Sequence, residues 1–262
     1  MCLIFIASQY HARYPLIIAA NRDEFYDRPT APVAFWDDYP HVAAGRDKKA
    51  GGTWLGITTG GRFAAVTNFR DPRHVNPDAP SRGGLVSDYL TGSLTPEKYL
   101  LNLQKEGRPY NGFNLVAGSL DDGVFYYSNR EKRVRRISPG LHGLSNHLLD
   151  TPWPKVETGR QKIKSLLDGD KTFFPEDLLA LLSDTAAPPD DRLPDTGVGL
   201  AWERVLSPMF IYSPDYGTRS SSVILVDADR RVRFVERAFE PGPDGRLKAR
   251  DRVITFQVDH GN

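Results

Sequence analysis

The stretch C-L-I-F-I-A-S-Q-Y-H-A-R-Y-P-L-I-I-A-A-N-R-D-E-F, residues 2–25, decides the fold. Two short apolar runs, 3–7 and 16–20, are rich in β-branched residues and are separated by polar residues and by Pro15. Runs of this length with turn residues between them predict a hairpin of two largely buried strands. The chain is therefore expected to begin with a core strand.

Outward from this hairpin, further hairpins and helices follow. The charged, proline-rich stretch 22–50 predicts a long ordered loop, and G-G-T-W-L-G-I-T-T-G-G-R-F-A-A-V-T-N-F (51–69) predicts two strands joined by a Gly-Gly turn. Apolar residues at helical spacing predict a helix over 82–90. A second helix is expected over 95–104, because its first residues are a capping threonine and a proline.

The rest of the chain repeats this order of strands, helices and strands. The predicted ranges are 114–117, 124–128, 134–137 and 140–144 as neighbouring antiparallel strands, 154–167 and 175–182 as helices, 186–197 as a mobile loop, and 220–226, 232–238 and 252–258 as closing strands. Because strands and helices come in blocks rather than as βαβ units, the sequence predicts an α+β fold of two antiparallel sheets flanked by helices. We expect residues 1–262 to form a single domain.

The composition excludes several classes of protein. With 34 Lys+Arg against 33 Asp+Glu, the formal charge is +1, so nucleic acid is not an expected partner. The single cysteine excludes an intramolecular disulfide and a cysteine-rich zinc site. The first apolar run has no basic region before it, and no run reaches the ~18 apolar residues of a membrane-spanning helix. We therefore expect no transmembrane segment and a cytoplasmic location.

Cys2 is the first candidate for chemistry. A second residue as small as cysteine normally permits removal of Met1, which would leave a thiol and a free α-amine on one residue. The α-amine has an ordinary pKa of roughly 8, so it can accept the thiol proton without a histidine. The alternative is a structural cysteine, since free cysteine is among the most buried residue types.

The polar group Asn21, Arg22, Asp23 and Glu24 ends the second apolar run. If the first two strands pair as a hairpin, Asp23 lies near the N-terminus, where its carboxylate would orient an ammonium group. Arg22 is then a candidate for holding a substrate carboxylate, with Asn21 as a further substrate-binding residue. The alternative is a salt-bridged strand end with ordinary capping and turn duties.

Several motifs together resemble the NRDE-motif proteins, which include the transport and Golgi organisation protein 2 family. The motifs are N-R-D-E-F (21–25), G-G-T-W-L-G-I (51–57), T-N-F (67–69), Y-N-G-F-N-L (110–115) and G-L-S-N-x-L-L-x-T-P-W-P-K (143–155). The resemblance runs from Met1 to about Val226. It implies an N-terminal nucleophile hydrolase fold, a four-layer αββα sandwich, which agrees with two sheets flanked by helices.

The resemblance also implies a set of site residues. The choloylglycine and penicillin V acylase group is similar in its N-terminal cysteine, an aspartate near the second strand and oxyanion-binding asparagines, and the matching positions are Cys2, Asp23, Asn68 and Asn146. Asn146 has an alternative role as a turn residue. The acylases' arginine falls at or near Ala20, so Arg22 stands in a different place.

Three other features have competing interpretations. Arg219 is predicted either as a second guanidinium at the site or as a surface charge, and Trp54 either as pocket wall or as core. The glycines around Trp54 lack the spacing of a phosphate-binding loop. The six histidines have no metal-binding or haem-attachment spacing, so no metal site is expected.

Two functions follow from these residues. The first is a cofactor-independent amidohydrolase in which Cys2 attacks a non-peptide carboxamide. The second is a non-enzymatic carrier that uses the same cleft for haem or a lipid, because the resembled family has been linked to both; Cys2 or a histidine would then ligate haem iron. A purely structural partner-binding protein ranks last, since it leaves so many polar motif residues without a purpose.

Overall fold

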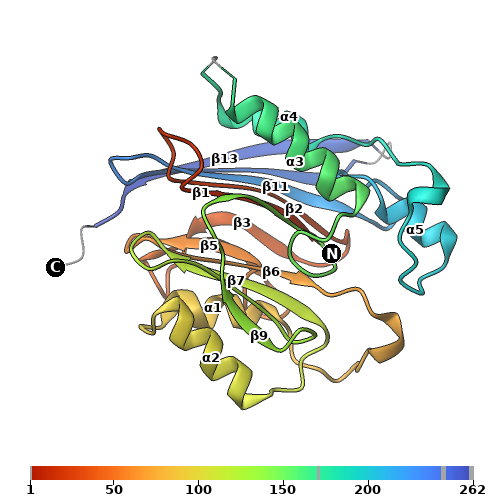
Figure 1. Ribbon diagram of the computed structural model, residues 1–262, viewed down its shortest axis with the longest axis horizontal. Helices are drawn as coiled ribbons and strands as arrows, with labels where there is room; N and C mark the ends of the chain where they lie inside the picture. The colour runs from red at the N-terminus through yellow and green to blue at the C-terminus, as the bar shows by residue number, and fades with distance from the viewer. Residues whose placement is uncertain (1, 170–171, 243–245, 260–262) are drawn as a thin grey trace.

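The computed structural model describes residues 2–169, 172–242 and 246–259. Two sheets stack face to face, and helices cover both outer faces (Figure 1). Helices α3 (Pro154–Leu167) and α4 (Pro175–Leu182) lie over one sheet, and α1 (Gly83–Thr91) and α2 (Pro96–Glu106) lie over the other. The predicted α+β fold and its four αββα layers are confirmed.

The first sheet contains the N-terminal hairpin at its centre. Its six strands are antiparallel and run in the order β10 (Gly140–Leu144), β1 (Cys2–Ser8), β2 (Leu16–Phe25), β11 (Tyr216–Val226), β12 (Arg231–Pro241) and β13 (Leu247–Gln257). Cys2 lies opposite Arg22, and this register continues to Ser8 opposite Leu16. The predicted hairpin is therefore confirmed.

The second sheet is a meander of neighbouring strands. It contains β3 (Thr30–Phe35), β4 (Val42–Asp47), β5 (Leu55–Thr58), β6 (Arg62–Asn68), β7 (Phe113–Ser119), β8 (Gly123–Ser128) and β9 (Arg133–Arg136), in that order. The Gly-Gly turn predicted at 60–61 joins β5 to β6. Gly61 has a φ of 76°, a conformation that glycine adopts without the strain of a side chain.

Alternation along the central strands divides the core into layers. On β1, Ile4 and Ile6 belong to the cluster between the sheets, whereas Leu3 and Phe5 pack on the side of α3 and α4. On β2, the even-numbered Ile18 faces the other sheet, so the even-numbered positions that follow it face the same way. This alternation decides where each polar residue of the N-R-D-E-F motif points.

Local signals explain the helices that the sequence predicts. The Thr95 side chain accepts a hydrogen bond from the Lys98 backbone, Pro96 occupies the first turn, and Gly107 at φ 58° ends α2. Proline also begins α3 and α4, as predicted. One short helix, α5 (Leu200–Leu206), was not predicted, because seven residues carry too little periodicity.

Two predictions about the strands were wrong. The stretch 22–50 is not one loop, because β2 continues to Phe25 and is followed by β3 and β4. Pro32 and half-exposed residues on the edge strand β3 hide its pattern. Strand β10 is not a neighbour of β9; it crosses to the first sheet and pairs with β1. Only the short turn Asp190–Arg192 is helical in the loop predicted at 186–197.

Within the described residues, every helix is too short or too polar to cross a membrane.

Candidate active site

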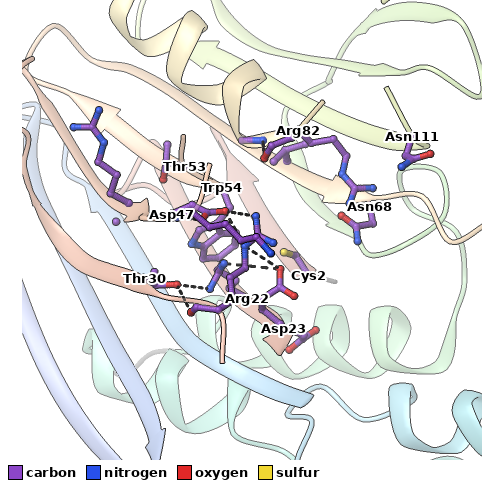
Figure 2. Close-up of a pocket in the computed structure, with 18 of the residues that line it drawn as sticks. Cys2, Arg22, Asp23, Thr30, Asp47, Thr53, Trp54, Asn68, Arg82 and Asn111 are labelled. Carbon is purple, nitrogen blue, oxygen red and sulfur yellow. Dashed lines mark hydrogen bonds and ion pairs between the residues drawn. The ribbon is translucent and has the colours of Figure 1, made fainter. Parts of the chain in front are cut away.

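A polar cavity of about 390 Å³ lies where β1 begins and β2 ends. Figure 2 shows Cys2 beside Arg22 and Asp23, with Asn68 and Arg82 across the opening. Both sheets contribute, because Cys2 and Arg22 come from the first sheet and Asn68 from the end of β6 in the second. The site predicted from the N-terminal hairpin is thus located between the sheets.

Cys2 is the first residue of β1, and only 7% of it is exposed. Its even-numbered position on β1 directs the thiol toward the space between the sheets. Its backbone oxygen accepts a hydrogen bond from Ser145 Oγ at 3.5 Å, just after β10. Burial raises the pKa of the thiol, the charge of Asp23 raises it further, and the charge of Arg22 lowers it. Burial therefore makes the thiolate harder to form, and the neighbouring charges modify that effect.

Asp23 lies on the helix-facing side of β2, one position beyond the residue opposite Cys2. Because the strands are antiparallel, the backbone nitrogen of Cys2 points along β1 toward the level of Asp23. Asp23 Oδ1 accepts a hydrogen bond from Thr218 Oγ1 at 2.8 Å, and Thr218 accepts one from the Ile211 backbone at 2.9 Å. Burial raises the pKa of Asp23, and the charges of Lys155 and Arg70 oppose that rise.

Arg22 lies in the wall of the cavity with 6% of its surface exposed. Its Nη1 donates to Thr30 Oγ1 at 3.2 Å, and its Nη2 lies 3.9 Å from Glu24 Oε2. The Thr30 hydroxyl fixes the direction of the guanidinium. The Glu24 carboxylate lies too far away to form a bidentate ion pair with it. Arg22 can therefore bind an anionic group in the cavity.

The two predicted oxyanion donors occupy different positions. Asn68 lines the cavity, and its side-chain amide bonds to no other described residue. Asn146 is fully buried behind it, where its Nδ2 donates to the Asn68 backbone oxygen at 3.2 Å and its Oδ1 accepts from Ser145 Oγ at 3.2 Å. Asn68 thus faces the cavity directly, whereas Asn146 supports the backbone that carries Asn68.

Asn21 does not line this cavity. It is completely buried on the helix side of β2, where its Nδ2 donates to the backbone oxygens of Leu182 at 2.9 Å and Met209 at 2.8 Å. Its Oδ1 accepts from Ser221 Oγ at 2.6 Å. These bonds join β2 and β11 to the end of α4 and to the segment after α5, so Asn21 holds the layers together outside the cavity lining.

Arg219 lies outside the cavity lining, and neither of its two predicted roles describes its contacts. A register shift between Thr218 and Ser220 places it in a bulge of β11. Its Nη1 donates to the backbone oxygens of Phe25, Tyr26 and Arg28 at 2.8, 3.0 and 3.1 Å. Arg219 therefore fixes the turn that follows β2. A bulge that redirects one side chain is a feature that strand periodicity alone does not reveal.

Trp54 fulfils both of the roles considered for it. It lines the cavity and also packs against the core between the sheets and the core under α1.

The sequence did not reveal a set of basic residues around the opening. Arg28, Arg46, Lys49 and Arg82 line the cavity together with Arg22, and the acidic lining residues are Asp23, Glu24 and Asp47. Asp47 pairs with Arg28 at 2.6 Å, and Arg46 pairs with Asp38. Among the described residues, five basic and three acidic side chains thus line the cavity, which favours an anionic ligand. The clusters R-D-K-K (46–49) and R-G-G (82–84) are the signals that could have indicated it.

No group of three or more His, Cys, Asp or Glu side chains in the described part of the chain is arranged to hold a metal ion.

Comparison with known proteins places this geometry in context. A model of the family described as Transport and Golgi organisation 2 matches residues 1–241. The chain is 40% identical to a bovine (Bos taurus) Transport and Golgi organization protein 2 homolog, covering 91% of this chain and 93% of that protein, and 39% identical to the human one, covering 98% and 100%.

A solved structure is also similar in fold. It is the Caenorhabditis elegans ortholog of N-acylethanolamine-hydrolyzing acid amidase, with a TM-score of 0.50 and 12% identity over 86% of this chain and 92% of that chain.

Proposed function

The chain belongs to the Transport and Golgi organisation 2 family, and we propose that it is an N-terminal nucleophile amidohydrolase in which Cys2 attacks a non-peptide carboxamide. The observation that carries the proposal is the position of Cys2, whose thiol faces a polar cavity beside Arg22 and opposite the unoccupied amide of Asn68. A nucleophile, an anion-binding cation and an oxyanion donor are the components that acyl transfer requires.

The proposed reaction begins after loss of Met1 has freed the α-amine of Cys2. The amine takes the thiol proton, and the thiolate sulfur forms a bond to the carbonyl carbon of the substrate. The carbon–nitrogen bond then breaks, and the ammonium returns a proton to the leaving amine. Water, deprotonated by the same α-amine, attacks the thioester and releases the carboxylic acid and the thiol.

The other residues orient this reaction. Asn68 donates a hydrogen bond to the oxygen that gains negative charge, which is the position where a fixed donor lowers the barrier most. Asp23 lies at the level of the Cys2 backbone nitrogen, where a carboxylate orients and stabilises the ammonium form. Arg22, with the other basic residues of the lining, binds an anionic group of the substrate. Asn146 fixes the backbone of Asn68.

A haem or lipid carrier remains the second prediction, and no specific feature of the cavity favours it. The described lining contains no histidine to ligate iron beside Cys2. Its many charged side chains offer a lipid tail little apolar surface. A haem titration would support a carrier if a Soret band appeared with the native protein and was lost in Cys2→Ala.

The first test is an intact mass of the purified protein before and after exposure to a small thiol-directed electrophile, with Cys2→Ala as the control. The proposal requires that Met1 is absent and that Cys2 alone is modified. Amides are then screened, beginning with N-acylethanolamines, which the similar nematode structure is named for hydrolysing, and continuing with N-acyl amino acids, which carry a carboxylate. Retention of Met1, or turnover that survives in Cys2→Ala, would contradict the proposal.

A further inference from the structure

A chain of buried hydrogen bonds joins the two sheets beside the cavity. Thr67, the residue before Asn68 on β6, is 1% exposed, and its hydroxyl donates to the backbone oxygen of Ser145 at 2.7 Å. The same hydroxyl accepts a hydrogen bond from Nδ2 of Asn114 on β7 at 3.1 Å. Because a threonine hydroxyl has a single hydrogen to donate, these two bonds fix its direction. Thr67 thus connects the second sheet to the segment that follows β10 in the first sheet.

Asn114 extends this network on its other side. Its Nδ2 also donates to the backbone oxygen of His147 at 2.9 Å, and its Oδ1 accepts a hydrogen bond from the Tyr126 hydroxyl at 2.8 Å. The Tyr126 oxygen in turn accepts one from the Leu149 backbone nitrogen at 3.2 Å. Both side chains are completely buried. Every polar atom of the Thr67, Asn114 and Tyr126 side chains therefore has a partner, which makes a buried network rigid.

The network holds both groups that the proposed reaction brings together. On one side, β10 pairs with β1, and Ser145 Oγ donates to the Cys2 backbone oxygen at 3.5 Å. On the other side, Asn146 donates from Nδ2 to the Asn68 backbone oxygen at 3.2 Å. The Asn68 side chain bonds to no other described residue, so the backbone around it decides where its amide lies. Thr67 and Asn146 together fix that backbone.

Three motifs that are far apart in the sequence contribute to the network. Its side chains come from T-N-F (67–69), Y-N-G-F-N-L (110–115) and G-L-S-N (143–146). Thr67 and Asn114 lie behind the cavity and are not part of its lining. Their contribution to a reaction in the cavity would therefore be made through another residue.

We propose that Thr67 and Asn114 are positioning residues of the proposed oxyanion donor, Asn68. They hold the end of β6 against the segment after β10, which fixes the Asn68 amide relative to the Cys2 thiol. The inference rests on the proposed function, in which Asn68 binds the oxyanion. A donor stabilises developing charge only when it is already in place, and a displacement of about 1 Å can slow a reaction by roughly a hundredfold. Loss of the Thr67 hydroxyl would leave the Ser145 oxygen and an N–H of Asn114 without partners and would loosen the strand end.

The test compares two reactions of Cys2, the single cysteine of the chain, in the full-length protein. With p-nitrophenyl acetate, the thiolate sulfur forms a bond to the acetyl carbon and p-nitrophenolate leaves with the electron pair of the ester bond, so the carbonyl oxygen gains negative charge during the reaction. With iodoacetamide, the sulfur displaces iodide from a methylene carbon, and no carbonyl oxygen gains charge. The ratio of the two rates, corrected with Cys2→Ala, therefore measures stabilisation of the oxyanion rather than the reactivity of the thiol.

Thr67→Val removes the hydroxyl with little change of shape, Thr67→Ser keeps it, and Thr58→Val is the matched control. Thr58 is also 1% exposed in the second sheet, but its hydroxyl accepts a hydrogen bond from the Arg62 backbone at the turn between β5 and β6. We expect the ratio of acylation to alkylation to fall about a hundredfold in Asn68→Ala and roughly tenfold in Thr67→Val. Thr67→Ser and Thr58→Val should keep the wild-type ratio.

A ratio that falls in Asn68→Ala but is unchanged in folded Thr67→Val would overturn the inference and leave the proposed function intact. Equal falls in Thr67→Val and Thr67→Ser would also overturn it, because they would indicate packing rather than the hydroxyl. If Thr67→Val does not fold, Tyr126→Phe removes only the hydroxyl at the far end of the network. The ratio should fall in this variant too, and an unchanged ratio would overturn the inference.

Failure of the proposed function has a different signature. If Cys2 of the wild type is not acylated, or if Asn68→Ala keeps the wild-type ratio, the amidohydrolase proposal is contradicted and the inference fails with it.

Discussion

Asn21 and Arg22 are neighbours on β2, yet their side chains leave the strand on opposite faces. Asn21 makes three buried hydrogen bonds to the helix layer and to β11, whereas Arg22 reaches the cavity and bonds to a single hydroxyl. The motif continues to alternate, with Asp23 directed toward the helix side of β2 and Glu24 toward the cavity side, although Asp23 also reaches the cavity lining. One short polar sequence thus stabilises the fold with one face and forms the site with the other.

The largest effect on stability is expected at Asn21, which makes three buried hydrogen bonds on the helix side of β2. Asn21→Ala would leave two backbone oxygens and the Ser221 hydroxyl without partners in a buried place. Since each such loss costs ~1–3 kcal/mol, we expect the free energy of unfolding to fall by roughly 3 kcal/mol or more. Urea denaturation followed by circular dichroism measures it. A loss below about 1 kcal/mol would mean that Asn21 does not hold the layers together.

Asp23 sharpens the comparison, because it is on the helix side but acts on the nucleophile. Its negative charge raises the pKa of the Cys2 thiol, so Asp23→Asn should lower that pKa. Below its pKa a thiol reacts in proportion to its thiolate fraction, so alkylation at pH 7 should become about tenfold faster. Amide turnover should nevertheless fall, because no carboxylate then orients the ammonium group. Slower alkylation would show that the sign of this interaction is wrong.

On the cavity side, Arg22→Met should change reactivity in the opposite direction. The charge of Arg22 lowers the pKa of the Cys2 thiol, and its effect is smaller than the opposite effect of Asp23. Its loss should raise the pKa and slow alkylation at pH 7 by roughly threefold. Arg22→Lys keeps the charge and serves as the matched control. Equal rates in Arg22→Met and the wild type would remove Arg22 from the electrostatics of the nucleophile.

The smallest effect is expected at Glu24, the last member of the cavity-side pair. Its carboxylate is about a quarter exposed and lies 3.9 Å from Arg22 and 3.8 Å from Arg28. Exposed ion pairs of this kind contribute little, so Glu24→Gln should change the free energy of unfolding by less than about 0.5 kcal/mol. If the denaturation midpoint of Glu24→Gln moved as far as that of Asn21→Ala, the two faces of β2 would not differ in their contribution to stability.

The sequence was most informative where the determining contacts are local. The hairpin of β1 and β2 follows from two apolar runs and a proline, and its register alone brings Cys2, Arg22 and Asp23 together. Helix α2 follows from one capping threonine and one proline. The family resemblance added Asn68, which lines the same cavity.

Other parts of the site depend on contacts between distant segments. Arg82 reaches the cavity because the Thr53 backbone bonds to Gly83 at 3.3 Å, so that two loops meet at the rim. The opposite orientations of Asn21 and Arg22 can be predicted only if β2 is known to continue to Phe25. That length depends on pairing with β11, almost 200 residues later in the chain. Local periodicity contains no information about either contact.

The pairing of the N-terminal hairpin also bears on how the protein is made. On its two sides, β1 pairs with β10 and β2 pairs with β11, so both edges of the hairpin stay open until residues 140–144 and 216–226 have been synthesised. At ~5–20 residues per second, this interval lasts on the order of ten seconds. Open apolar strands bind chaperones or one another. The same interval leaves the N-terminus accessible to a methionine aminopeptidase, before folding reduces the exposure of Cys2 to 7%. Cys2 is thus synthesised well before β10 and β11, and the sheet around the proposed nucleophile closes only when both have been made.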